Sequence, residues 1–95
     1  MRFEWDEKKN RSNMMKHGIS FKEASEVFDD PLHVSILDER FDDNDERWIT
    51  IGATLKRTII VVGHLYSIVD NGEERIRIIT ARKALKNERD RYETL

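Results

Sequence analysis

The last third of the chain places arginines beside a carboxylate and a tyrosine. The run from Arg75 to Arg82 is strand-like, and Glu88, Arg89 and Tyr92 follow it at helical spacing. Such a charged stripe is poor core material, because a buried charge destabilises a fold unless it is paired. Guanidinium groups match phosphate oxygens, and several together would stabilise the extra charge of a pentacoordinate phosphate. The stripe therefore suggests a phosphate-binding site.

Several sheet arginines are candidates for that site. Arg75 and Arg77 share one face of the predicted strand, whereas Arg82 falls on the other face if the strand is regular. If the closing helix begins near Arg82, this side chain can instead turn toward the same cleft. Arg47 stands at the beginning of another predicted strand and adds a further guanidinium.

The alternative is that these charges only hold the fold together. Glu88 could pair with a sheet arginine as an ion pair that joins helix to strand. Glu46 and Glu74 are natural cross-strand mates for the other arginines. The residue types favour neither reading for the set.

The predicted first helix is also unusually polar. Lys9, Asn13, Lys16 and His17 occupy neighbouring positions on it. A helix of this kind is usually a solvated surface helix, and a histidine at its end commonly caps it. It could instead lie across a phosphate backbone.

Metal and cofactor sites are not expected. The three histidines lack metal-ligand spacing, and the chain has no cysteine to complete a site. The acidic residues 38–46 lack the glycine and the spacing of a calcium loop. No glycine-rich phosphate loop or nucleophile elbow occurs. An enzyme built on this chain would use arginine, lysine, glutamate, histidine or tyrosine without a metal.

Turn and capping signals predict the elements that position these residues. Asp6 and Gly18 bound the first helix, and Ser20 to Glu23 form a capping box that opens a second helix. Asn71-Gly72 predicts a hairpin between the last two strands. The expected strands span 3–5, 32–37, 47–54, 57–69 and 74–81, the helices lie between the first two and after the last, and 38–45 is a charged loop.

This order, β-α-α-β-β-β-β-α, predicts a single α+β domain over residues 1–95 with a mostly antiparallel sheet. Two helices precede most of the sheet and one helix closes it. The start of the chain lacks the apolar segment of a signal peptide, and the longest fully apolar run, 59–62, is far too short for a membrane span. We therefore expect a cytoplasmic protein without a membrane partner.

The net charge of −2 hides an uneven layout. Residues 30–46 hold one arginine against seven acidic residues, and residues 47–95 hold ten Lys and Arg against six acidic residues. A basic C-terminal half can meet a polyanion, since phosphate contacts supply most nucleic-acid affinity. The acidic segment could receive a basic protein partner.

Taken together, the sequence resembles the BrnT family of type II toxins, and the likeness spans nearly the whole chain in the right order. It rests on Phe3-Glu-Trp-Asp6, Asn13-Met-Met-Lys16-His17-Gly18-Ile-Ser-Phe21, Ala24 to Phe28, Asp30-Pro31, Glu46-Arg47, Ile51-Gly52, and Arg77-Ile-Ile-Thr-Ala-Arg82 with Glu88, Arg89 and Tyr92. The resemblance implies a RelE-like fold and a ribonuclease toxin that halts translation. It also implies a BrnA-like antitoxin with a ribbon-helix-helix domain, and operator DNA bound through that antitoxin.

Under this hypothesis the 2′-OH of the RNA, free or on the ribosome, attacks the adjacent phosphate, which requires a base, charge-stabilising donors and an acid. The candidates for these roles are Arg77, Arg82 and Arg47 on the phosphate, Glu46 or Glu88 as base, and Lys16, His17 or Tyr92 as acid or ribose contact. Lys9, Asn13, Arg75 and Arg89 are candidates for binding the remaining substrate. The competing hypothesis is a non-catalytic interaction module with a structural Arg/Glu stripe.

Overall fold

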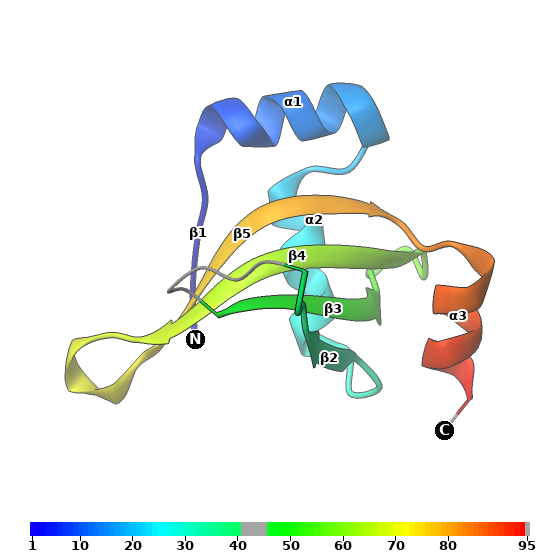
Figure 1. Ribbon diagram of the computed structural model, residues 1–95. Helices are drawn as coiled ribbons and strands as arrows, with labels where there is room; N and C mark the ends of the chain where they lie inside the picture. Colours follow the sequence, from blue (N-terminus) through cyan, green and yellow to red (C-terminus); the bar gives the residue numbers. More distant parts are fainter. Residues whose placement is uncertain (41–45, 95) are drawn as a thin grey trace.

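The computed structural model describes residues 1–40 and 46–94, and within these ranges five strands form one sheet (Figure 1). The strands are β1 (Arg2–Glu4), β2 (Val34–Leu37), β3 (Arg47–Ala53), β4 (Ile59–Ile68) and β5 (Glu74–Lys83). Their spatial order is β1-β5-β4-β3-β2. β1 pairs with β5 in parallel, and all other pairs are antiparallel. The predicted α+β class and element order are confirmed.

The helices are α1 (Glu7–His17), α2 (Phe21–Ser25) and α3 (Lys86–Glu93), and 3-10 turns form at η1 (Glu26–Asp29) and η2 (Asp70–Gly72). Asp6 caps α1 by accepting the backbone N–H groups of Lys8 and Lys9, and Gly18 ends it with a φ of 70°. Ser20 accepts the N–H of Glu23 at the start of α2. These predicted helix boundaries are confirmed, although α2 passes into η1 after five residues.

The main core lies between the sheet and the segment from α1 to η1 (Figure 1). Its buried residues are Ile19, Phe21, Ala24, Val27, Ile60, Val62, Ile76, Ile78 and Ala81. Gly52 lets η1 approach β3 closely, since a Cβ there would stand 2.9 Å from the Cβ of Val27. This packing leaves the opposite sheet face for other contacts.

A smaller cluster occupies one end of that opposite face, where α3 packs. Ile51, Val61 and Ala84 are buried there, and Tyr92 packs against them. α3 lies beside one end of the sheet in Figure 1. We call this side of the sheet, opposite the main core, the open face.

A β-bulge in β5 changes which side chains share the open face. Gly63 pairs with Thr80 and His64 pairs with Ile78, so Ile79 is an additional residue that opposes no partner on β4. The bulge resets the alternation of side chains along β5. Arg82, which pairs with Val61, therefore shares the open face with Arg77, which pairs with Leu65.

This geometry corrects the expectation for Arg82. The regular-strand rule placed it on the face opposite Arg75 and Arg77, and that placement is wrong because the strand is not regular. The other route that we considered, a helix beginning near Arg82, does not occur either, since β5 continues to Lys83 and α3 begins at Lys86.

The described helices are also too short and too polar to cross a membrane.

Candidate active site

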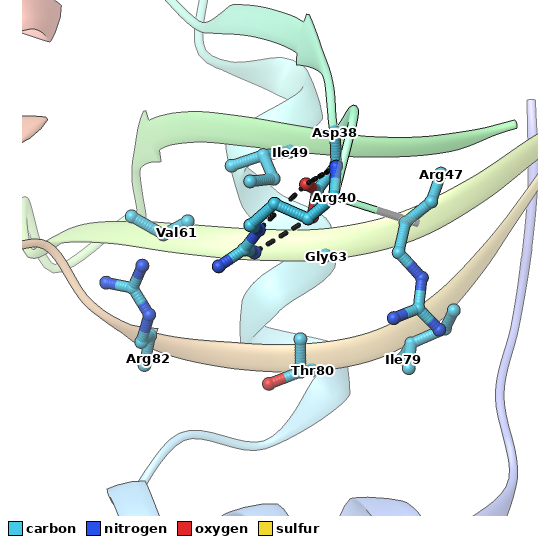
Figure 2. A pocket seen from close by; sticks show the side chains of 9 residues that line it. All are labelled: Asp38, Arg40, Arg47, Ile49, Val61, Gly63, Ile79, Thr80 and Arg82. Atoms are coloured by element: carbon cyan, nitrogen blue, oxygen red, sulfur yellow. Dashed lines mark hydrogen bonds and ion pairs between the residues drawn. The ribbon is translucent and has the colours of Figure 1, made fainter. Parts of the chain in front are cut away.

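A hollow of about 100 Å³ lies on the open face (Figure 2). Its lining residues are Asp38, Arg40, Arg47, Ile49, Val61, Gly63, Ile79, Thr80 and Arg82. Among the described residues, three arginines reach it from separate segments: Arg40 from the loop after β2, Arg47 from the start of β3, and Arg82 from the end of β5. We call it the arginine hollow.

The floor of the arginine hollow is apolar, and the space above it depends on a glycine, which has no side chain. Ile49 and Val61 supply hydrocarbon surface from β3 and β4. A Cβ on Gly63 would stand only 2.7 Å from the Cγ2 atom of Thr80, so a larger residue would fill this space or push the bulge aside. Charges beside an apolar floor interact more strongly than in water, because the local dielectric constant is lower.

Arg40 is held over the hollow by a buried carboxylate. Asp38 is 6 % exposed and accepts hydrogen bonds of 2.9 Å from both Nε and NH2 of Arg40, as the dashed lines in Figure 2 show. These bonds lower the pKa of the Asp38 carboxyl below its usual value. The backbone N–H of Asp38 also donates to the carbonyl of Arg47 at 2.7 Å, which ties this loop to β3.

Sequence reasoning missed Arg40. It counted this residue only as the one cation in an acidic segment. The available signal was the spacing Asp38-x-Arg40, in which a carboxylate can orient a guanidinium two residues later. That signal is short and common, and the distance from residue 40 to Arg82 along the chain hides their proximity.

Arg82 forms a bidentate ion pair with Glu88. Its NH1 and NH2 atoms lie 2.7 and 2.8 Å from Oε1 and Oε2 of Glu88. Glu88 also accepts the backbone N–H of Leu85 at the start of α3. The Arg82 guanidinium, by these hydrogen bonds, holds the pKa of Glu88 below its usual value. The structural reading, in which Glu88 joins α3 to a sheet arginine, is confirmed for this pair.

This pairing does not remove Arg82 from the hollow. The bidentate contact uses two of the five N–H donors of a guanidinium, and a third donates to the carbonyl of Lys83 at 3.4 Å. The Arg82 side chain remains 35 % exposed, against 19 % for Glu88. Arg82 can therefore be positioned by Glu88 and still offer donors to a phosphate.

Arg75 and Arg77 lie along the same strand but outside the arginine hollow. NH1 of Arg77 lies 3.2 Å from Oε1 of Glu4, and Nε of Arg75 lies 3.9 Å from the same atom. Arg75 also donates to Oγ of Ser67 at 3.1 Å. The parallel register of β1 and β5 places Glu4 directly beside Arg77, which explains this small network.

The mates that we expected for the arginines are engaged elsewhere. Glu46 is exposed and accepts the indole N–H of Trp48 at 3.3 Å, and Glu74 accepts the hydroxyl of Tyr66 at 2.9 Å. The expected ion pairs of Glu46 and Glu74 with sheet arginines were therefore wrong. The prediction overlooked the parallel strand β1, whose Glu4 pairs with Arg75 and Arg77. Glu46 does not line the arginine hollow.

Tyr92 and Arg89 also point to other partners. The hydroxyl of Tyr92 donates to Oδ2 of Asp30 at 2.5 Å, and this bond raises the pKa of Tyr92 to about 12. Arg89 is exposed and donates to the carbonyl of Ala84 at 3.2 Å. Neither side chain lines the arginine hollow, so α3 contributes to it only through Glu88.

A second hollow lies between α1 and β5, on the other side of Thr80. It is lined by Lys9, Ser12, Asn13, Lys16, His17, Ile79 and Thr80. Four of the predicted site residues, Lys9, Asn13, Lys16 and His17, therefore line the same hollow. We call it the α1 hollow.

Asn13 has a structural task at the base of the α1 hollow. It is 6 % exposed, and its amide donates to the carbonyls of Ile19 and Ala81 at 2.9 and 2.8 Å. Its oxygen accepts the N–H of Ala81 at 3.1 Å. Asn13 thus takes the place of a neighbouring strand beside Ala81 and fixes α1 against β5.

Within residues 1–40 and 46–94, no group of three His, Asp or Glu side chains is arranged to hold a metal ion. The polar side chains that line the two hollows are arginines, lysines, hydroxyl groups, the Asn13 amide and the His17 ring, with Asp38 as the carboxylate among them. This composition suits an anionic ligand.

The fold is a small α+β domain, and the site gathers cations on an exposed face of its sheet. This combination is typical of proteins that bind phosphates or nucleic acids. The chain belongs to the BrnT family, whose description is "Ribonuclease toxin, BrnT, of type II toxin-antitoxin system", and it matches that family over residues 5–88. It is thus a ribonuclease toxin of a type II toxin–antitoxin system, with RNA as substrate and a protein antitoxin as partner. The family resemblance found in the sequence is confirmed.

The fold is similar to that of a solved relative. The crystal structure of the Brucella abortus ribonuclease toxin BrnT superposes with a TM-score of 0.63 at 24% sequence identity, and the match covers 90% of this chain and 99% of that chain. Comparison with curated proteins gives no significant match. The likeness to the Brucella toxin bears out the predicted α+β architecture.

Proposed function

We propose that this protein cleaves RNA without a metal ion, and that the arginine hollow holds the phosphate that is cut. The observation that supports this most is the convergence of Arg40, Arg47 and Arg82 around an apolar floor. Two of these guanidinium groups are oriented by carboxylates, Asp38 and Glu88. Preorganised donors stabilise developing charge without reorganising during the reaction.

The proposed reaction uses the RNA as its own nucleophile. The 2′-oxygen attacks the adjacent phosphorus, and the bond from phosphorus to the 5′-oxygen breaks. One proton leaves the 2′-hydroxyl and one reaches the departing 5′-oxygen, so the products are a 2′,3′-cyclic phosphate and a 5′-hydroxyl. The phosphorane between these states carries an additional negative charge, which the arginines would stabilise.

Charge stabilisation, rather than a strong general base, is the chemistry that these residues support. Asp38 and Glu88 both have a lowered pKa and both accept hydrogen bonds from an arginine. Such carboxylates are weak bases. Tyr92, with a pKa of about 12, is a poor acid near neutrality. Water would then carry the protons, unless Lys16 or His17 from the adjacent α1 hollow donates to the leaving oxygen.

The test is cleavage of a short RNA in EDTA. We expect cutting to persist, with a 2′,3′-cyclic phosphate at the new end. A substrate with a single 2′-deoxynucleotide at the cut position should resist cleavage there and nowhere else. Loss of cutting on chelation, or cutting at the deoxynucleotide, would contradict the proposed chemistry.

The competing function is a non-catalytic interaction module. It is favoured by the pairing of the sheet arginines, because Glu4 holds Arg75 and Arg77 and Glu88 holds Arg82. Under this reading, Arg82→Ala lowers the melting temperature, and the wild-type protein leaves RNA intact. Growth arrest on expression without the partner would speak for the toxin that cuts RNA.

For the partner we propose a BrnA-like antitoxin with a ribbon-helix-helix domain, which would bind operator DNA with the toxin attached in the cytoplasm. Family membership supports the antitoxin, and the acidic sequence of residues 38–46 suits a basic partner surface. Co-purification of the product of the neighbouring reading frame, followed by a gel shift with upstream DNA, tests this. A shift by the toxin alone, or no co-purification, would contradict it.

A further inference from the structure

The α1 hollow offers two lysine ammonium groups that form no close ion pair with a described carboxylate. Within residues 1–40 and 46–94, no Asp or Glu oxygen lies within 4.0 Å of the Lys9 or Lys16 ammonium. Both side chains are exposed, and both line the hollow with His17. The sheet arginines differ, since Glu4 and Glu88 partly neutralise them.

The two hollows meet at a single residue. Thr80 lines both of them, and Ile79, the additional residue of the bulge, does so as well. Figure 2 shows the methyl group of Thr80 turned toward Gly63 and its hydroxyl turned away from the arginine hollow. Ile79 and Thr80 thus separate the two hollows, with cations on both sides of them. We call this boundary the rim.

The rim is reachable because β1 is short. β1 pairs only with Arg75 to Arg77 of β5, and beyond that point α1 takes the place of a neighbouring strand. Asn13 satisfies the backbone of Ala81 there, so the lysines on the same helix face stay available to a ligand rather than serving the fold.

We propose that the α1 hollow is a second phosphate-binding site, which holds the RNA backbone next to the phosphate that is cut. The RNA strand would cross the rim at Thr80, with one phosphate at Arg47 and Arg82 and a neighbouring one at Lys9 and Lys16. This rests on the proposed function, because it places the cut in the arginine hollow. Lys9 and Lys16 then bind substrate instead of transferring protons.

A non-cleavable RNA separates binding from chemistry. We suggest measuring the affinity of a 2′-O-methyl 10-mer and of a 2′-O-methyl dinucleotide for wild type, for Lys9→Ala/Lys16→Ala, and for Lys56→Ala. Lys56 lies in the turn between β3 and β4 and lines neither hollow, so it is the matched control. Circular dichroism confirms that each variant is folded.

The double variant should bind the 10-mer about tenfold more weakly than wild type, the size expected for two exposed ionic contacts. Its dependence of log affinity on log salt should become shallower by about 0.7, since the two lysines share one phosphate and each neutralised phosphate on a single strand contributes about 0.7. The dinucleotide should lose much less, and Lys56→Ala should bind the 10-mer like wild type.

An equal loss for both lengths, no loss for the 10-mer, or an equal loss in Lys56→Ala would overturn the second site. This result is independent of the proposed cleavage chemistry, because the ligand cannot react. If wild type binds the 10-mer as expected but fails to cut RNA in EDTA, the proposed function fails while the binding site stands.

Discussion

Replacing Glu88 by glutamine distinguishes a carboxylate that positions Arg82 from one that acts as a base. The variant keeps the shape of the side chain and the acceptor for the N–H of Leu85, but it removes the charge that faces Arg82 at 2.7 and 2.8 Å. If Glu88 only positions the guanidinium, the main consequence is a loss of stability.

The size of that loss follows from the geometry and the exposure. Hydrogen bonds between charged groups contribute about 1.5–3 kcal/mol when shielded, whereas exposed ion pairs contribute about 0–1 kcal/mol. With Arg82 35 % exposed and Glu88 19 % exposed, we expect Glu88→Gln to lower the free energy of unfolding by about 1 kcal/mol at pH 7.

The pH dependence has a definite sign. The pKa of Glu88 is lowered by the hydrogen bonds from Arg82, so the pair stabilises the fold above the ordinary value of 4.5, and this contribution is lost as the pH falls below it. Urea denaturation at pH 7 and near pH 3.5 should therefore show a smaller difference between wild type and variant in acid. Glu93→Gln on the same helix is the control.

Cleavage gives the second readout. The positioning role predicts that Glu88→Gln still cuts RNA, with a fall in kcat well below 10²-fold, because Arg82 keeps its charge but loses part of the contact that orients it. A base role predicts a fall in kcat of about 10²-fold or more. Such a fall in a folded variant, or an unchanged free energy of unfolding at pH 7, would refute the reasoning.

Three further predictions concern buried positions. Asn13→Ala should lower the free energy of unfolding by about 3 kcal/mol, because the buried backbone N–H and carbonyl of Ala81 would lose their hydrogen-bond partner. Ser12→Ala should have little effect in the same urea titration. Gly63→Ala should lower the melting temperature because of the 2.7 Å approach to Cγ2 of Thr80; Thr80→Ser, which deletes that methyl, should restore much of the loss, and failure of this rescue would count against the packing account. Burial lowers the pKa of His64 from 6.5 to about 4, so between these pH values the unfolded chain binds a proton that the folded chain does not. The free energy of unfolding should therefore fall by about 3 kcal/mol from pH 6.5 to pH 4, and His64→Gln should make it less dependent on pH.

Local signals in the sequence predicted the elements well. Asp6, Gly18 and Ser20 mark helix ends through interactions with nearby backbone, and these caps form as expected. Asn71 and Gly72 form the expected reversal, with φ values of 74° and 76° within η2. Such features depend on neighbours within a few residues, so they can be predicted from one sequence.

The long-range pairing could not be predicted in the same way. The parallel contact of β1 with β5 joins residues more than seventy positions apart, and it decides that Glu4 faces Arg77. The bulge at Ile79 has no clear composition signal, yet it sets the face on which Arg82 lies. Register, rather than residue type, therefore limited the prediction of the site.

The sequence predicted which residue types form the candidate site, and the structure changed which residues belong to it. Arg47 and Arg82 meet as expected, whereas Arg40 joins them from a segment treated only as an acidic loop. Asn13 resembles a substrate contact in sequence, but its amide completes the edge of β5. A polar residue on a polar helix gives no sign of burial, because its partners lie on a distant strand.

The most direct test of the account compares kcat for RNA cleavage in EDTA between Arg47→Ala and Arg75→Ala. Both variants remove a guanidinium from the open face, but only Arg47 lines the arginine hollow. The account predicts a loss of about 10²-fold or more for folded Arg47→Ala, as for the removal of a charge-stabilising donor, and a small change for Arg75→Ala. Equal effects of the two substitutions, or full activity of Arg47→Ala, would contradict it.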